Sequence, residues 1–210
     1  AGMAHEIKNP LASIKTFAEY LPKKYDDPEF REKFSRIVGQ EVNKINTMVQ
    51  ELLDFAKPKS PEPQPTRLSK LIDETIEFLH GSLVDKHITI ARAYSTQDSV
   101  WVDPNQMKQV FLNLLMNSIQ AMHRPGCITI STVAENGHLA VLVADTGPGI
   151  PRQELSKVFD PFYTTKPVGK GTGLGLSICY GVLREHAGNI SCHNRTEGGA
   201  SFRVELPAVL

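Results

Sequence analysis

The chain has 210 residues, with 23 basic and 23 acidic side chains and a formal net charge of zero at pH 7. A chain of this length can bury one large core or two small ones. Its charge balance favours neither a nucleic-acid surface nor an anionic membrane surface, so we expect no direct nucleic-acid partner. The three cysteines are widely spaced and form no paired motif, which is typical of reduced thiols in a cytoplasmic protein.

Apolar residues recur every three or four positions in two stretches near the N-terminus. This spacing predicts one helix up to about Leu21, ended by Pro22, and a second over roughly residues 29–56. A helical hairpin alone has too little core to be stable, so we expect two copies to pair as a four-helix bundle. The alternative is that its apolar stripe packs on another domain of the same chain.

Residues 57–65 alternate proline with polar side chains in the run K-P-K-S-P-E-P-Q-P. Proline cannot continue a helix, so this run predicts an extended, semi-rigid connection. We therefore divide the chain into a helical domain over residues 1–57, a Pro-rich linker over 58–66 and a second domain over 67–210.

The second domain mixes the two periodicities. Helices are predicted over residues 68–79, 104–122 and 174–186, and strands over 88–93, 99–102, 127–133, 139–144 and 200–206. This order favours a two-layer α/β sandwich with helices on one face of a mixed sheet, so the whole chain belongs to the α+β class.

The first helix carries the run H-E-I-K-N-P at residues 5–10. On a helix His5 faces away from the apolar stripe, with Asn9 one turn further along the same face. A neutral imidazole is a nucleophile, and the Glu6 carboxylate is placed to accept its proton. Pro10 weakens the turn that contains His5. A zinc motif H-E-x-x-H is excluded because residue 9 is Asn, but the run alone also fits an ordinary surface histidine.

Two asparagines, Asn113 and Asn117, lie four residues apart on one predicted helix, so their amide oxygens share a face. Mg²⁺ prefers oxygen ligands and bridges the phosphates of a nucleotide while keeping several waters. The alternative, a solvated polar face, is weakened by the apolar residues on either side of both asparagines.

Two glycine-rich runs follow predicted strands or precede a predicted helix. The run D-T-G-P-G-I at residues 145–150 lets backbone approach a flat ligand while Asp145 accepts a hydrogen bond from an exocyclic amine. The run G-T-G-L-G-L at residues 171–176 opens a helix, where bare amides bind phosphate. It is neither a dinucleotide fingerprint nor a Walker loop.

Taken in order, these motifs resemble the catalytic core of two-component sensor histidine kinases, with its H, N, G1, F and G2 boxes. The resemblance covers nearly the whole chain and implies a phosphoacceptor hairpin that dimerises, followed by a GHKL (Bergerat) ATP-binding domain. It implies an enzyme that uses ATP and Mg²⁺ to phosphorylate His5 and then transfers the phosphoryl group to an aspartate of a response regulator. Asn9 matches the residue that positions water for dephosphorylation of that regulator, so phosphatase activity is also implied.

The same resemblance assigns the site residues. Asn117 is the implied metal ligand with Asn113 assisting, Asp145 selects adenine, and Ser201 lies where the family often has a threonine near the adenine. The F box flanks a lid, and the glycine- and lysine-rich stretch over residues 166–173 is expected to be mobile, with Lys166 and Lys170 as candidate phosphate contacts when it closes. The remaining implied nucleotide-binding residues are Gly147, Gly149, Ile150, Phe159, Tyr163, Thr164, Thr165, Gly171, Thr172, Gly173, Leu174, Gly175 and Leu176.

Finer expectations follow from the likeness to nitrogen-regulation-type kinases, which suggests an enhancer-type transcriptional regulator as the partner. The chain begins inside a helical pattern, so we expect a core in the cytoplasm, with a sensor or membrane region elsewhere in a longer protein. Two rival hypotheses share the nucleotide motifs: another GHKL ATPase or protein-serine kinase, and a non-enzymatic nucleotide-sensing dimer. The H-E-x-x-N run argues against the first, and the complete set of motifs argues against the second.

Overall fold

The computed structural model describes residues 2–56, 60–123, 125–135, 137–166 and 171–208, with only the backbone of residues 2–6, 51 and 54–56. By their contacts the residues form two units. One comprises Ala1–Lys59 with Asp160–Gly175, and the other comprises Ser60–Phe159 with Leu176–Leu210. The division at Lys59 falls inside the predicted linker, but no sequence pattern predicted that Asp160–Gly175 groups with the hairpin. Within the described residues, no helix is both long and apolar enough to cross a bilayer.

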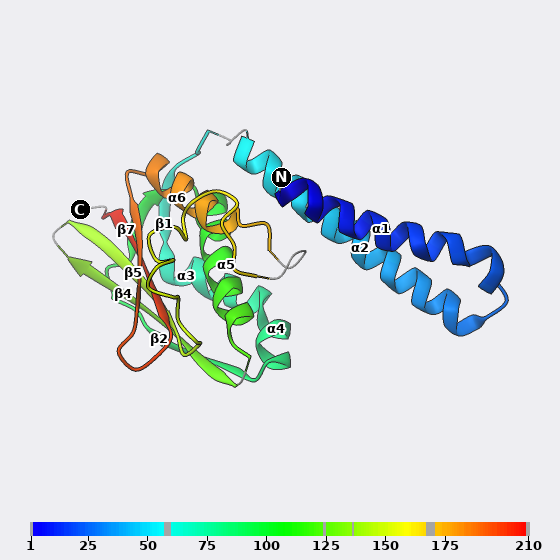
Figure 1. The fold of residues 1–210 in the computed structure, drawn as a ribbon. Coiled ribbons are helices and arrows are strands. Elements are labelled where there is room, and N and C mark those ends of the chain that lie inside the picture. Colours follow the sequence, from blue (N-terminus) through cyan, green and yellow to red (C-terminus); the bar gives the residue numbers. More distant parts are fainter. Residues whose placement is uncertain (1, 57–59, 124, 136, 167–170, 209–210) are drawn as a thin grey trace. The chain divides into compact units, whose positions relative to one another are not determined.

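The N-terminal hairpin consists of α1 (Gly2–Lys24) and α2 (Pro28–Ala56), as the sequence predicts (Figure 1). Asp27 caps α2, since its Oδ1 accepts hydrogen bonds from the backbone N–H of Glu29 at 3.0 Å and of Phe30 at 3.3 Å. Pro28 occupies the first helical position, where a missing N–H costs nothing.

The prediction that Pro22 ends the first helix is wrong, because α1 continues to Lys24. A proline so close to the C-terminal end removes only one hydrogen bond, to a turn that is nearly complete. Lys23 and Lys24 in the last turn also interact favourably with the negative end of the helix dipole.

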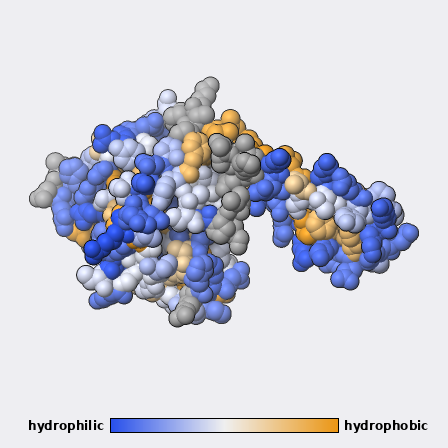
Figure 2. Space-filling model, in the orientation of Figure 1, coloured by the Kyte–Doolittle hydropathy of each residue, from blue (hydrophilic) through white to orange (hydrophobic). Residues whose placement is uncertain are grey.

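The hairpin buries little of its own apolar surface. The rings of Phe17 and Phe30 pack across it with centroids 6.1 Å apart, and Met48 is 4% exposed. Yet Val49 and Leu53 on α2 remain 41% and 56% exposed, and Figure 2 shows hydrophobic atoms along the hairpin beside hydrophilic ones. An apolar stripe of this kind is typical of a surface that another element covers.

The second unit is the predicted α/β sandwich. Its main sheet has the order β2-β4-β5-β7-β6, with only β2 and β4 parallel, and α3, α5 and α6 lie on one face (Figure 1). The helices are α3 (Leu68–Phe78), α4 (His80–Asp85), α5 (Pro104–Ala121) and α6 (Gly175–Glu185), and the main-sheet strands are β2 (Ile88–Ala93), β4 (Gly126–Glu135), β5 (His138–Asp145), β6 (Asn189–Asn194) and β7 (Ala200–Pro207).

The core lies between this sheet and its helices. On β5 the alternate residues Leu139, Val141 and Val143 are at most 1% exposed, and they belong to one cluster with Phe111 and Leu114 of α5. Side chains on a strand alternate between faces, so Asp145 shares this helix-covered face. The sequence did not predict β6, because only Ile190 and Cys192 of that strand are apolar and the rest are polar.

A separate two-stranded sheet joins β1 (Gln64–Arg67) to β3 (Ser99–Val102) in antiparallel register, with Gln64 opposite Val102. The second unit, which begins at Ser60, thus takes in most of the predicted linker, and linker residues 64–66 lie in β1. The linker boundaries otherwise stay a prediction.

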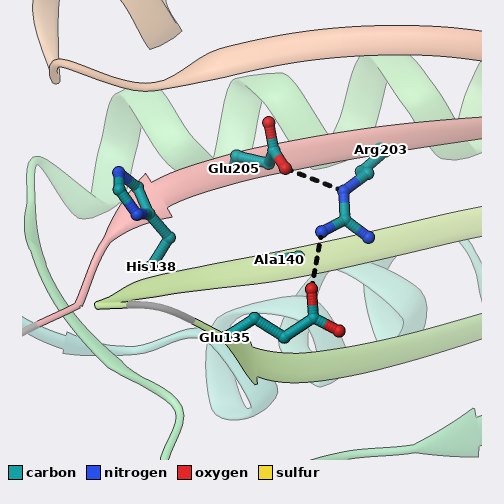
Figure 3. A pocket seen from close by; sticks show the side chains of 5 residues that line it. All are labelled: Glu135, His138, Ala140, Arg203 and Glu205. Carbon is teal, nitrogen blue, oxygen red and sulfur yellow. Dashed lines mark hydrogen bonds and ion pairs between the residues drawn. The ribbon is translucent and has the colours of Figure 1, made fainter.

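The outer face of the main sheet carries a polar cluster around Arg203 (Figure 3). Its guanidinium bonds to Glu205 on the same strand at 2.8 Å and to Glu135 on β4 at 3.2 Å. The bond to Glu135 crosses β5 at Ala140, whose small side chain leaves room for it. The two carboxylates, Glu205 foremost, raise the pKa of Arg203 above its ordinary value. The cluster ties the strands together on the face opposite Asp145.

Candidate functional site

The predicted phosphoacceptor motif lies within α1. His5 and Glu6 are helical, but their side chains lie outside the part of the chain that the structure describes. Asn9 is exposed, and Pro10 lies inside the helix rather than at its end. The helical setting of the motif is therefore confirmed, while the orientation of His5 stays a prediction.

The two asparagines of the metal-ligand prediction lie on α5. Asp103 caps this helix, with its Oδ1 accepting from the backbone N–H of Asn105 at 2.8 Å and of Gln106 at 3.2 Å. Asn113 and Asn117 are half-buried on the same helix. Burial raises the pKa of the Cys179 thiol to about 12, against the lowering effect of a hydrogen bond with the Asn113 side chain. That contact ties α5 to α6.

Asp145 ends β5, and its carboxylate is held from three directions. Its Oδ1 accepts from the backbone N–H of Gly147 at 2.8 Å and of Ala200 at 3.2 Å, and its Oδ2 accepts from the Ser118 hydroxyl at 3.2 Å. The side chain is 3% exposed. A carboxylate has about four acceptor positions. Among the described residues these three bonds leave one position on Oδ2, which suits the exocyclic amine of adenine.

Glycines let two chain segments close around Asp145. Gly199 has a φ of +91°, and a Cβ there would overlap the Asp145 carbonyl oxygen. Gly149 has a φ of +77°, with a hypothetical Cβ 2.9 Å from Asn194 Oδ1. Asn194 also accepts from the Ile150 N–H at 2.7 Å and donates to the Ile150 carbonyl at 2.5 Å. These contacts fix the turn over residues 145–150 against the end of β6.

Ser201 lies on β7, on the sheet face opposite the Asp145 carboxylate, and its place near the adenine stays a prediction. It pairs with Ala144 across β5 and β7, and directly opposed residues share a face. Since successive side chains alternate, Ser201 lies on the face opposite Asp145. The residue of β7 that meets Asp145 is Ala200, through its backbone N–H.

The segment Asp160–Gly175, which groups with the hairpin unit, contains a tight turn of its own. Phe162 has a φ of +66°, and its N–H donates to the Gly173 carbonyl at 3.0 Å. Gly173 has a φ of +68°, and a Cβ there would lie 2.5 Å from the Phe162 carbonyl carbon. Two threonine hydroxyls cap the loop internally: Thr164 accepts from the Lys166 N–H at 3.2 Å and Thr172 from the Leu174 N–H at 3.3 Å.

This segment leads directly into α6, which begins at Gly175, so the predicted loop-to-helix setting is confirmed. Tyr163 and Lys166 are partly buried, Thr165 is exposed, and Lys170 lies outside the described residues. Phe159 packs on Tyr180 of α6 with ring centroids 6.3 Å apart, and Leu176 is half-buried in the first turn of that helix.

The donor set fits a magnesium ion that arrives with its nucleotide. The described residues contain no group of three His, Cys, Asp or Glu side chains placed to hold a metal by themselves. The amide oxygens of Asn113 and Asn117 are hard donors of the kind Mg²⁺ takes when phosphates and water supply its other ligands.

Sequence reasoning missed three residues that position the site. Ser118 bonds to the Asp145 carboxylate, Arg195 donates to the Asp145 carbonyl at 3.0 Å, and Asn194 holds Ile150. Each contact joins residues at least 27 positions apart, so no local pattern announces it.

Two family models match separate parts of the chain. The model for the histidine kinase-, DNA gyrase B- and HSP90-like ATPases matches residues 102–210, and the model for the His Kinase A (phospho-acceptor) domain matches residues 1–61. The chain therefore belongs to the two-component sensor histidine kinases and represents their catalytic core.

Individual relatives agree with this assignment. The chain is 35% identical over 209 residues to sporulation kinase C of Bacillus subtilis (strain 168), covering 99% of this chain and 48% of the relative. It is 32% identical over 208 residues to the sensor histidine kinase ZraS of Escherichia coli (strain K12), covering 99% of this chain and 44% of the relative. Histidine kinase ThkA, solved in complex with response regulator protein TrrA, superposes with a TM-score of 0.82 at 33% identity, covering 98% of this chain and 60% of that chain.

The chain spans about half the length of these curated relatives. Their names do not assign it to the nitrogen-regulation-like subgroup, which stays a prediction.

Proposed function

We propose that this chain is an ATP-dependent protein-histidine kinase that phosphorylates itself on His5 and passes the phosphoryl group to an aspartate of a response regulator. The observation that carries the proposal is the joint presence of the phosphoacceptor motif on α1 and of a buried Asp145 with one acceptor position left for adenine. A GHKL ATPase of another branch would not require the phosphoacceptor motif.

In the first step the bond between the γ-phosphorus of ATP and its bridging oxygen breaks, and a bond from the phosphorus to an imidazole nitrogen of His5 forms. Glu6 takes or stabilises the proton on the other ring nitrogen. Asp145 and the glycine turns hold the adenine, and Asn113 and Asn117 would hold Mg²⁺, which neutralises the phosphate charge. The amides at the start of α6, with Lys166 and Lys170, would complete the phosphate contacts.

The phosphoryl group then leaves His5 for a carboxylate oxygen of the regulator. Asn9, exposed one turn along α1, is the proposed residue for orienting the water that hydrolyses the resulting acyl phosphate. We further propose that the chain works as a homodimer through α1 and α2, and in the cytoplasm, where ATP is supplied. That ThkA was solved with a response regulator supports the choice of partner class.

The test is a two-step transfer assay with a purified receiver domain. The chain is first labelled with γ-³²P-ATP and Mg²⁺, freed of nucleotide, and mixed with the receiver. Transfer of label to the receiver, together with no transfer to a receiver variant that lacks its aspartate, supports the proposal. Label that forms on the receiver only while ATP is still present would contradict the two-step route. An Asn9→Ala variant should keep the transfer and lose the later release of phosphate.

A further inference from the structure

The Pro-rich linker is anchored within the ATP-binding unit before its first strand begins. The Glu62 N–H donates to Oδ2 of Asp103 at 3.0 Å, two residues ahead of β1. Asp103 is 7% exposed while Glu62 is exposed, so this bond is partly buried. The stretch of chain between the end of α2 at Ala56 and the anchored residue is therefore residues 57–61.

Asp103 is also fixed to both helices that carry nucleotide residues. Its other carboxylate oxygen, Oδ1, caps α5, the helix of Asn113 and Asn117. Its backbone N–H donates to His186 Nε2 at 3.0 Å, just beyond the C-terminal end of α6. Since His186 Nε2 accepts this bond, the ring carries its proton on Nδ1, which lies 2.8 Å from the Val182 carbonyl.

The bonds to Asp103 stabilise its charged form. Burial opposes ionisation, but the backbone N–H groups of Glu62, Gln106 and Asn105 together hold the pKa of Asp103 below its ordinary value. At neutral pH the side chain is thus an acceptor on both oxygens, one facing the linker and one facing α5.

We propose that Asp103 is a positioning residue that sets where the linker joins the ATP-binding unit, and thereby how well a bound nucleotide is presented to His5. This inference rests on the proposed kinase function. Without the bond to Glu62 the unanchored stretch extends to residue 63, adding about 7 Å of extended chain. A longer and less oriented tether lowers the effective concentration of one site at the other. Nucleotide affinity is left unchanged, because neither Glu62 nor Asp103 is among the residues assigned to nucleotide binding.

The hydrogen bond between Glu62 and Asp103 is tested by changing its donor and its acceptor in turn, in the whole 210-residue chain. Glu62→Pro removes the donor and suits the extended conformation expected before Pro63. Asp103→Asn keeps a good helix cap but turns a donor toward the Glu62 N–H. Glu62→Ala keeps the N–H and is the matched control. Both test variants should lower kcat for His5 phosphorylation at least about threefold, with KM and Kd for ATP within about twofold of wild type, while Glu62→Ala matches wild type.

Hydrogen exchange supplies a readout that does not depend on activity. The Glu62 amide should be protected in wild type and exchange faster in Asp103→Asn. Equal kcat in all four proteins would overturn the proposal, as would a Glu62 amide that exchanges in wild type as fast as an unstructured peptide. If the wild type forms no phosphohistidine, the kinase function fails on its own and the exchange data still decide whether the anchor exists.

Discussion

At the scale of single residues, the Asp145 carboxylate, which we propose recognises adenine, is tightly constrained. Asp145 ends a strand, is almost fully buried, and accepts hydrogen bonds from a turn, a neighbouring strand and a helix. Such a network leaves little freedom for the carboxylate to move, so its remaining acceptor position is fixed in direction.

Replacing Asp145 with Asn tests this assignment. Oδ1 can still accept from Gly147 and Ala200, but an amide NH₂ replaces Oδ2 and faces the adenine amine donor to donor. Hydrogen bonds to charged groups contribute about 1.5–3 kcal/mol, so ATP affinity should fall about 10- to 100-fold. Calorimetry with non-hydrolysable analogues of ATP and GTP measures the affinity of the variant for each nucleotide. The preference for ATP over GTP should become smaller, because the new NH₂ can donate to the guanine O6. An unchanged preference would contradict the role of Asp145 in selecting adenine.

A second buried carboxylate makes stability depend on pH. Asp98, 1% exposed, accepts from the Ser69 N–H at 2.9 Å and from Arg67 Nε at 3.2 Å. Burial opposes ionisation, but these bonds hold the pKa of Asp98 below its ordinary value. A depressed pKa stabilises the fold above the unfolded-state pKa of about 3.9, and that stability is lost as the pH falls through the folded-state pKa.

Asp98→Asn should therefore lower the free energy of unfolding by about 1–3 kcal/mol at pH 7, with the gap to wild type narrowing below about pH 4. Urea titrations at pH 7 and pH 3 check this. The single tryptophan, Trp101 on β3, reports on the unit that contains Asp98. A gap that stays constant across this range would show that the charge of Asp98 does not stabilise the fold.

At the scale of elements, alanine substitutions at two adjacent glycines distinguish the effect of backbone strain from the effect of a steric clash. Gly198 and Gly199 have φ of +93° and +91°, so alanine at either position pays a similar conformational cost of about 1–2 kcal/mol. Only at Gly199 would the added Cβ overlap the Asp145 carbonyl, whereas nothing lies within 4 Å at Gly198.

Gly199→Ala should abolish measurable ATP binding, while Gly198→Ala keeps it and loses only some thermal stability. Calorimetric titration with an ATP analogue, together with thermal unfolding of each variant, makes the comparison. Similar affinities for the two variants would mean that the close approach of β7 to the turn is not required.

The helices and the central strands were predictable because their apolar spacing is strong and local. The hairpin, α5 and the three strands β4, β5 and β7 follow directly from it. The order of strands, the pairing of Gln64–Arg67 with β3, and the partners Ser118 and Asn194 depend on contacts between distant segments. The face on which Ser201 lies depends on the register between β5 and β7, which spacing along one strand does not reveal.

At the scale of the whole molecule, the hairpin needs a partner surface. Val42, Val49 and Leu53 follow one another at intervals of seven and four residues, so they share one face of α2, and all three are exposed. A second copy that covers this face gives the four-helix bundle expected from the sequence.

Val49→Asp should convert a dimer into a monomer, because a charge buried at the bundle centre without a partner is costly. Asn43→Asp, about a third of a turn away from Val49 around the helix, is the matched control and should remain dimeric. Light scattering on size-separated protein reports both masses. A wild-type chain that is monomeric at micromolar concentration would contradict the bundle.

The most direct test of the account is labelling with γ-³²P-ATP and Mg²⁺, comparing wild type with His5→Gln. We expect protein-bound label in the wild type that is lost in acid, stable in alkali and absent from the variant. That result would establish a phosphohistidine at His5. Label that persists in His5→Gln, or no label in a wild type that binds ATP, would contradict the assignment of this chain as a histidine kinase acting through His5.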